Sequence, residues 1–443
     1  MDKTIEEFVV PHETKERGST MVGELRSEGA TFPKILAQFS KLHPYTRKAE
    51  IHLYPTLEQV KKLYALPSPF SFVAERFVNK ELQETWNAQG IWLKSGSRSG
   101  VSSPIFWSAP FGQVESLEIV SAPMRDRFKS AAPIAWFAVS RCLLFQLLAN
   151  PDKEDNEIFV RHGITRKKPF FLSVSDGANA EVTRRPRARR TKRLTEVTKN
   201  GYSVTIRGYK DVEAARQDAE AIMILASLAS REQTMFWHWN SSSGKGDLKR
   251  IWRFNASKFP KRSHHHKPLT PRDPDAAQRF MATAFPLYRS ALYRPHFDSA
   301  VYALMANELV LELRIAGLFA GIQGALVFAL QQPRGKKRPQ MRPLLEKFIA
   351  TFGDHFADLW PLLRDPRGGL SLWDLRNAVV HGDTFGEEDF LALSFASDNL
   401  SWILERILLL ALGWNIDNSD VSSRCLENFY SYKWRTEQRK LKL

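Results

Sequence analysis

Residues 371 to 382 read Ser-Leu-Trp-Asp-Leu-Arg-Asn-Ala-Val-Val-His-Gly. Ser371 and Asp374 have the spacing of a capping box, so we predict that a helix begins directly after Ser371. Gly382 suits the left-handed conformation that ends many helices, which places the end of this helix near residue 381. The apolar residues of the segment are expected to hold one helix face against a core; they are Leu375, Val379 and Val380.

This short helix would carry an arginine and a histidine, Arg376 and His381. A histidine side chain, with an ordinary pKa of about 6.5, can accept a proton from a ribose 2′-hydroxyl. The planar guanidinium of an arginine fits a phosphate and keeps its charge. Asn377 would orient a phosphate or the imidazole. Residues five apart on a helix differ by about 140° in azimuth, so we expect His381 to lie in a frayed last turn that bends toward the arginine.

The pattern Arg-Asn-x-x-x-His-Gly follows a leucine-rich stretch and precedes a long amphipathic helix. It resembles the signature of the HEPN superfamily, a group of small all-α domains of which many are metal-independent ribonucleases. Arg376, Asn377 and His381 match the motif position by position. By helix order the resemblance covers about the last 170 residues, and within the superfamily the chain looks nearest to the ApeA-like branch.

The resemblance implies a homodimer formed through the motif helices, with two arginines and two histidines in one composite cleft. It implies 2′-hydroxyl attack that leaves a cyclic phosphate and a free 5′-hydroxyl. It also implies a role as a toxin or anti-phage defence effector, set off by a phage-derived trigger. The alternative is a non-catalytic HEPN-type scaffold for RNA or protein binding and dimerisation.

A purely structural interpretation of the motif stays open. In it, Arg376 pairs with a helix carboxylate such as Glu405, and His381 only caps its own helix. For Glu405 itself we favour a surface ion pair with the neighbours of Arg406.

Composition sets the outer limits on function. The chain has 443 residues, 43% of them hydrophobic and 12% aromatic, which predicts two or three folded domains. Lys and Arg number 64 against 48 Asp and Glu, a net charge of +16. A strongly basic soluble protein attracts polyanions, so RNA is the expected partner. The two cysteines and the absence of a hydrophobic start predict a cytoplasmic protein without disulfides.

No motif in the chain indicates a cofactor or a metal. Gly244-Lys245-Gly246 lacks the frame of a phosphate-binding loop, and no dinucleotide fingerprint follows a strand. The three histidines 264 to 266 have no cysteine or carboxylate pattern around them. Residues 315 to 330 are apolar apart from Gln323 but shorter than the roughly 20 residues of a membrane span, so we predict a buried core helix and no membrane contact.

The predicted fold class is α+β, with N-terminal mixed α/β regions followed by an all-α HEPN-like helical bundle. We divide the chain into an N-terminal mixed domain (1–150), an α+β domain with a basic loop (151–267) and a HEPN-like helical ribonuclease domain (276–443). Three prolines between 267 and 274 predict the linker before the last domain. The middle domain is expected to hold strands at 158–160, 170–174 and 202–206, a helix at 212–228 and a hairpin formed by 235–239 and 248–254.

The last domain is expected to contain six helices. The first spans 276–293, and the second spans 297–330 with one break near Gly317 to Gly324. Helices at 341–352 and 355–363 follow, then the motif helix and a closing helix from about 387 to 412. An apolar stripe along the closing helix would carry the core that holds Arg376 in place.

Two basic segments are candidates for guiding RNA. The first lies within 181–193, in the predicted loop, and contributes Arg184, Arg185, Arg187, Arg189 and Arg190. The second lies in a loop of the helical domain and contributes Lys336, Lys337 and Arg338. A dense run of like charges repels itself unless a polyanion neutralises it. For each segment, RNA contact and a merely solvated loop are equally weighted interpretations.

Overall fold

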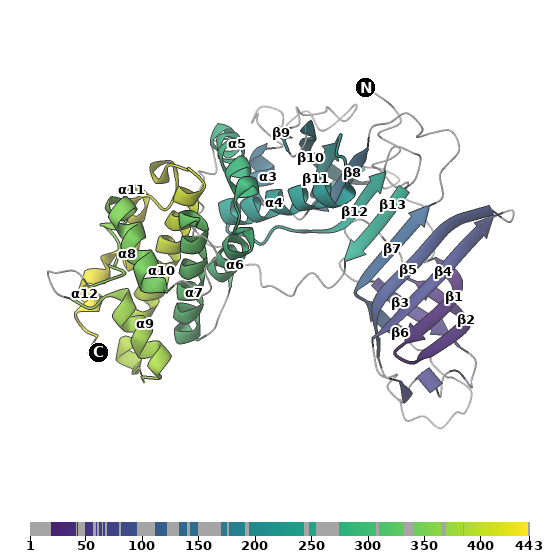
Figure 1. The fold of residues 1–443 in the computed structure, drawn as a ribbon, viewed down its shortest axis with the longest axis horizontal. Coiled ribbons are helices and arrows are strands. Elements are labelled where there is room, and N and C mark those ends of the chain that lie inside the picture. Colours follow the sequence, from purple (N-terminus) through teal and green to yellow (C-terminus); the bar gives the residue numbers. More distant parts are fainter. Residues whose placement is uncertain are drawn as a thin grey trace. The chain divides into compact units, whose positions relative to one another are not determined.

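The structure is a computed structural model that describes residues 19–40, 42, 49–55, 59, 62, 63, 65, 66, 69–78, 81–94, 111–121, 133–139, 142–148, 170–174, 177–190, 195–242, 248–253, 274–306, 310–331, 340–364, 369–383 and 385–441. It divides into two compact units (Figure 1). Unit 1 comprises 1–140, 173–219 and 235–258, and unit 2 comprises 141–172, 220–234 and 259–443. Strands lie mainly in unit 1 and long helices mainly in unit 2, which confirms the predicted α+β class.

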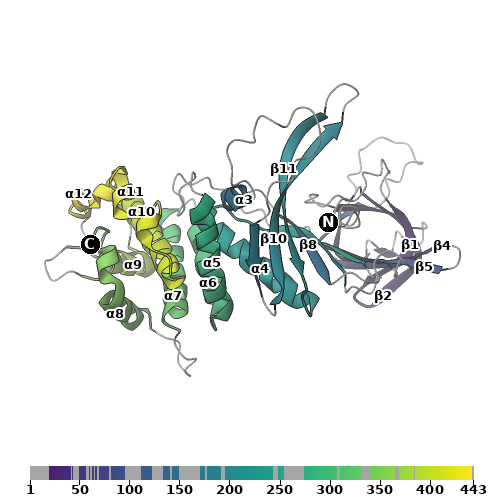
Figure 2. The same cartoon turned by 90° about the horizontal axis from the view of Figure 1, so that it is seen from above.

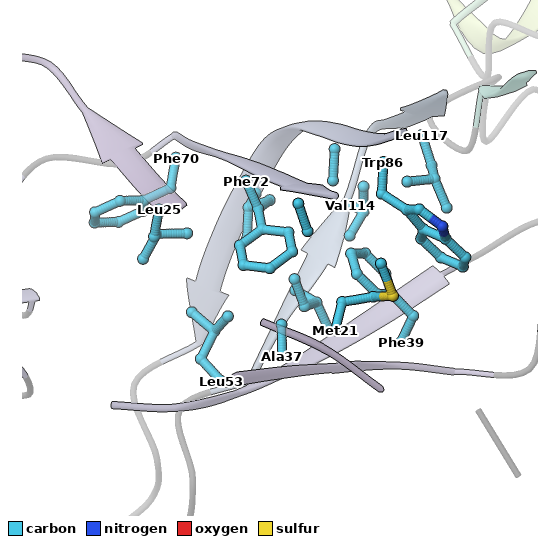
Figure 3. Packing of buried hydrophobic residues seen from close by; sticks show 14 of the residues in the cluster. Met21, Leu25, Ala37, Phe39, Leu53, Phe70, Phe72, Trp86, Val114 and Leu117 are labelled. Atoms are coloured by element: carbon cyan, nitrogen blue, oxygen red, sulfur yellow. The ribbon is translucent and has the colours of Figure 1, made fainter. Parts of the chain in front are cut away.

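Unit 1 begins with six antiparallel strands: β1 (Thr20–Ser27), β2 (Ala30–Phe39), β3 (Ala49–Tyr54), β4 (Phe70–Val78), β5 (Glu81–Lys94) and β6 (Phe111–Val114). They form a closed ring, because β4 pairs with both β1 and β5 while β6 joins β3 to β5. Alternate residues point inward and form a core that includes Phe39, Phe72 and Trp86 (Figure 3). The apolar alternation of these strands therefore fills the ring with side chains.

A bulge connects this ring to the rest of the sheet. Gly90 has a φ of +63°, and a Cβ there would lie 2.3 Å from the Glu115 carboxylate, so glycine is required. Glu115 N–H donates to the Gln89 carbonyl at 3.1 Å. Beyond this point the chain continues as β7 (Ser116–Ser121), which stays paired with β5 but takes β13 as its other neighbour.

The sheet then continues in the order β7-β13-β12-β8-β11-β10-β9. The bounds of these strands are β8 (Ile134–Val139), β9 (Phe170–Ser173), β10 (Asn179–Arg190), β11 (Thr195–Arg207), β12 (Phe236–Ser242) and β13 (Leu248–Arg253). The predicted strands at 170–174 and 202–206 and the predicted hairpin are confirmed, and so is the helix, as α4 (Val212–Ser230). The strand expected at 158–160 lies outside the described residues. Because β8 lies between β12 and β11, regions 1–150 and 151–267 contribute strands to one sheet.

The basic segment at 181–190 is not the loop that we predicted. It forms most of β10, which pairs with β11 from Asn179 opposite Arg207 to Arg190 opposite Thr195. Charge repulsion argues against a strand, but antiparallel pairing with β11, interrupted by one register shift between Arg187 and Ala188, satisfies most backbone hydrogen bonds of the segment.

Unit 2 contains α3 (Leu143–Leu148), α5 (Pro274–Ser290), α6 (Arg294–Met305), α7 (Leu311–Leu330), α8 (Met341–Phe352), α9 (Leu372–His381), α10 (Phe390–Ala411), α11 (Ser423–Leu426) and α12 (Trp434–Gln438), with 3-10 turns at Gly353–Phe356, Glu387–Asp389, Ile416–Asn418 and Tyr430–Lys433. Helix α7 contacts α6, α8, α9 and α10 (Figure 2). Helix α8 has the predicted bounds, and α10 with its preceding 3-10 turn confirms the closing helix.

The predicted break of the long second helix is misplaced. Helix α6 ends at Met305 and α7 begins at Leu311, whereas the glycines at 317–324 lie inside a continuous α7. A Cβ at Gly321 would lie 2.8 Å from the Ala303 Cβ, and one at Gly324 would lie 2.8 Å from the His296 carbonyl oxygen. These glycines therefore allow α6 to approach α7 closely and do not interrupt the helix.

The helix predicted at 355–363 is also wrong. Only the 3-10 turn Gly353–Phe356 forms, and Asp358 then accepts hydrogen bonds from both terminal guanidinium nitrogens of Arg406, at 2.6 and 2.8 Å. Tyr432 O–H donates to the same carboxylate at 3.2 Å. Side-chain bonds from two other elements thus fix this segment, and a sequence pattern cannot show them.

Helix α7 is, among the described residues, the one helix long and apolar enough to cross a membrane by length and composition alone. Its most apolar window has a mean hydropathy of 1.8, and 61% of that window is buried inside the structure. Arg314 near its N-terminus is buried and donates to the carbonyls of Ala303 and Leu304 at the end of α6, at 2.8 and 2.9 Å. This cation satisfies carbonyls at a helix C-terminus, where the helix dipole favours positive charge.

Candidate active site on helix α9

Helix α9 begins as the sequence predicts. Ser371 Oγ accepts from the Asp374 N–H at 3.2 Å, and Asp374 Oδ2 accepts from the Ser371 N–H at 2.9 Å. Arg364 Nε donates to the same carboxylate at 3.2 Å. Burial raises the pKa of Asp374, but the bonds from Ser371 and the charge of Arg364 outweigh it and hold this pKa below its usual value. The capping box therefore fixes the first turn of α9.

The C-terminus of α9 is regular up to His381, so our expectation of a frayed last turn is wrong. Gly382 has a φ of +81° and donates to the Val379 carbonyl at 3.3 Å, while Asp383 N–H donates to the Ala378 carbonyl at 3.0 Å. These two bonds form a Schellman motif, which satisfies the last carbonyls of the helix. As a consequence, Arg376 and His381 point about 140° apart on the helix and lie about 7.5 Å apart along it.

The buried face of α9 differs in part from the predicted one. Leu372, Leu375 and Ala378 are buried, whereas Val379 is half-buried and Val380 is 52% exposed. The buried residues recur every third position, so the packed face includes Ala378 and excludes Val380. Val380 lies about 40° from Arg376 around the helix, which places an exposed apolar side chain beside the arginine.

Two side chains hold the guanidinium of Arg376. Its Cζ lies 5.2 Å from the centroid of the Trp373 ring, and its Nη1 donates to Asn377 Oδ1 at 3.1 Å. Trp373 is itself fixed by an edge-on contact with Phe319 of α7, with ring centroids 6.3 Å apart. Arg376 is half-buried, and a guanidinium has five N–H donors. The arrangement therefore orients a cation and leaves donors that can bind an anion.

His381 is the last residue of α9 and lies on a different face of the helix from Arg376. Its side chain is exposed. Within the part of the chain that the structure describes, its imidazole has no hydrogen-bond partner. One chain thus presents Arg376 and His381 on two different faces of α9 and does not bring them together.

Glu405 is neither a surface residue nor the partner of Arg376, which corrects both of our interpretations. Its side chain is fully buried, and it accepts from Arg231 Nε at 2.8 Å and contacts the Arg231 Nη2. Arg231 follows α4 directly and has a φ of +47°. The two residues are 174 positions apart in sequence. The signal that could have indicated burial is the pair Glu405–Arg406 inside an otherwise apolar run, because buried charges require partners.

The remaining predicted site residues divide into two groups. The backbone of Arg184, Arg185, Arg187, Arg189 and Arg190 lies on β10 in unit 1. Lys336, Lys337 and Arg338 lie outside the described residues, and so do the histidines 264 to 266. Among the residues that the structure describes, no group of His, Cys, Asp or Glu is arranged to hold a metal ion.

Comparisons with known proteins find no relative of this chain. No protein-family model matches the sequence, and no curated protein or solved structure is detectably similar to the chain.

Proposed function

We propose that the protein is a metal-independent endoribonuclease whose C-terminal bundle is of the HEPN type. The observation that carries the proposal is the arrangement on α9. A capped helix orients the Arg376 guanidinium between Trp373 and Asn377, and it exposes His381 at its end. The match of these residues to the HEPN motif and the net charge of +16 support the choice of RNA as substrate.

The chemistry requires one base and one cation. The His381 imidazole accepts the proton of a ribose 2′-hydroxyl, and the 2′-oxygen attacks phosphorus. Arg376 stabilises the negative charge that develops on the phosphoryl oxygens. The 5′-oxygen leaves and takes a proton from an imidazolium. The products are a 2′,3′-cyclic phosphate and a 5′-hydroxyl, and the number of protons is conserved.

A homodimer would bring the two groups together. Because Arg376 and His381 diverge on one helix, a two-fold pairing of α9 with its copy is the simplest way to place the arginine of one protomer beside the histidine of the other. Val380 lies beside Arg376 on α9 and is 52% exposed, which supports an apolar contact in this region. The proposed setting is the cytoplasm, where such a nuclease would act as a defence effector or toxin that a phage-derived trigger releases.

The test compares cleavage of total RNA in EDTA by the wild type, Arg376→Ala and His381→Ala. Loss of a positioned base or charge-stabilising group should reduce the rate by about 10²- to 10⁴-fold. Arg424→Ala and His296→Ala, exposed residues of unit 2, are the matched controls and should cut at the wild-type rate. End-group analysis should find cyclic phosphates.

If Arg376→Ala and His381→Ala cut as well as the wild type, these residues do not form the active site. If the wild type binds RNA in a salt-dependent manner but does not cut it, the scaffold alternative replaces the nuclease.

A further inference from the structure

Strands β10 and β11 extend beyond the sheet as a two-stranded ribbon (Figure 2). They pair with each other from Asn179 opposite Arg207 to Arg190 opposite Thr195. Strand β8, the other neighbour of β11, pairs only with Tyr202–Arg207. Strand β9 has four residues and lies at the far end of β10, where Val174 N–H donates to the Ala178 carbonyl at 2.9 Å. In the described part of the chain, residues 184–190 thus pair with β11 alone, over about 20 Å.

The register concentrates positive charge on this ribbon, which we define as residues 184–190 and 195–201. Five of its seven β10 residues are arginines, and Arg187 lies opposite Lys199. The only acidic residue on the ribbon is Glu196, opposite Arg189, so five arginines and one lysine against one glutamate leave a net charge of +5. Like charges directly opposite each other destabilise a strand pair, and an isolated two-stranded ribbon is marginal in water. A polyanion bound to the ribbon would remove this repulsion.

We propose that the ribbon is a second RNA-binding subsite, which captures the phosphate backbone of long RNA independently of the cleavage site. The inference rests on the proposed function and extends it to a substrate class. The ribbon belongs to unit 1, and Arg376 and His381 belong to unit 2. A chain with two linked contacts binds a polymer that reaches both more tightly than an oligonucleotide that reaches one. Arginine–phosphate contacts read no bases, so capture is independent of sequence.

Salt dependence gives the expected size of the effect. Each phosphate neutralised on a single strand contributes about −0.7 to the slope of log K against log salt concentration, so five arginines contribute about −3.5. The competing explanation is that a charged strand edge only prevents edge-to-edge aggregation. That explanation predicts no dependence of RNA binding on these arginines.

The experiment measures binding by fluorescence anisotropy with the full chain carrying His381→Ala, so that RNA is not degraded. The probes are single-stranded RNAs of about 10 and about 60 nucleotides. Because the two contacts are linked in one chain, we expect the longer RNA to bind with an affinity about 10²-fold higher than the shorter one. In the ribbon variant, Arg184, Arg185, Arg187, Arg189 and Arg190 are replaced by glutamine. In the matched control, five exposed cations elsewhere are replaced by glutamine: Lys34, Lys347, Arg424, Lys433 and Arg439.

The ribbon variant should lose the preference for the longer RNA, and its salt slope should become shallower by about 3.5, while the control keeps both. A milder variant, Arg189→Gln with Arg190→Gln, should change the slope by about 1.4 and serves if the full variant does not fold. The inference is overturned if the ribbon variants bind the long RNA as tightly as the control does.

Cleavage separates this inference from the proposed function. With His381 restored, the ribbon variant should show a KM for long RNA raised about 10²-fold, with an unchanged kcat and unchanged cleavage of the short RNA. If the ribbon variant cuts both long and short RNA at the wild-type rate, the ribbon inference is wrong and the proposed nuclease function still stands. Ribbon-dependent binding without any cleavage by the wild type refutes the nuclease and leaves the ribbon as an RNA-binding surface.

Discussion

Replacing Glu405 by glutamine should destabilise unit 2 more than any comparable change on its surface. Glu405 and Arg231 form an ion pair in which the side chains are 0% and 3% exposed. The substitution removes the negative charge and keeps the size of the side chain, so that the guanidinium of Arg231 stays buried without the carboxylate that it contacts directly. Burial already lowers the pKa of Arg231 to about 9, and the group remains protonated at neutral pH.

The expected loss follows from this geometry. Removing one partner of a buried ion pair typically costs about 3–5 kcal/mol. The left-handed backbone of Arg231 adds strain on the order of 1 kcal/mol, which the native contacts must already offset. For a unit of this size, about 1 kcal/mol corresponds to roughly 2–4 °C in Tm, so Glu405→Gln should lower Tm by roughly 6–20 °C.

Urea unfolding gives the free-energy loss and thermal unfolding gives the change in Tm, both followed by tryptophan fluorescence, with Glu346→Gln as the matched control. Glu346 pairs with Arg342 on α8, where the side chains are 55% and 66% exposed, so its loss should cost less than about 1 kcal/mol. The double variant Arg231→Met with Glu405→Leu removes both charges and should lose far less than the sum of the single losses. Equal effects of Glu405→Gln and Glu346→Gln, or additive losses in the double variant, would refute the reasoning.

Three further predictions concern unit 2. Gly321→Ala should cost about 1–3 kcal/mol because its Cβ meets α6, whereas Gly317→Ala, with open space around it, should gain up to about 1 kcal/mol; thermal denaturation of both variants checks the contrast. Ser371→Ala should cost about 0.5–2 kcal/mol through loss of the cap, measured by urea unfolding, and an unchanged midpoint would contradict the capping role. Burial raises the pKa of Asp298 to about 6, with Tyr288 donating to it and Arg294 partly opposing the rise. The folded state therefore binds more protons than the unfolded state between pH of about 4 and about 6, and stability falls by up to about 3 kcal/mol as pH rises through that window. Asp298→Asn should abolish this fall in urea midpoints, and a variant that retains it would show that another group is responsible.

Features that depend on neighbouring residues could be predicted from the sequence. The capping box of Ser371 and Asp374 and the left-handed Gly382 fixed both ends of α9, because each signal acts within four or five residues. The bounds of α8 also followed from local periodicity.

Features that depend on distant partners could not be predicted. Glu405 reads as a surface residue until Arg231 is placed beside it, and Gly321 reads as a helix breaker until α6 is packed against it. The arginines of β10 predict a loop by their repulsion, yet pairing with β11 makes them part of a strand. The same limit applies to the candidate site, because local pattern placed Arg376 and His381 on one helix but could not supply the second chain that would join them.

The central claim is that the arginine of one protomer acts with the histidine of the other. Mixing inactive Arg376→Ala and His381→Ala proteins, with exchange of subunits, tests it directly. Half of the dimers would be mixed, and each would hold one intact composite site, so RNA cleavage should return to about one quarter of the wild-type rate. A mixture that stays as inactive as its separate components would contradict the account.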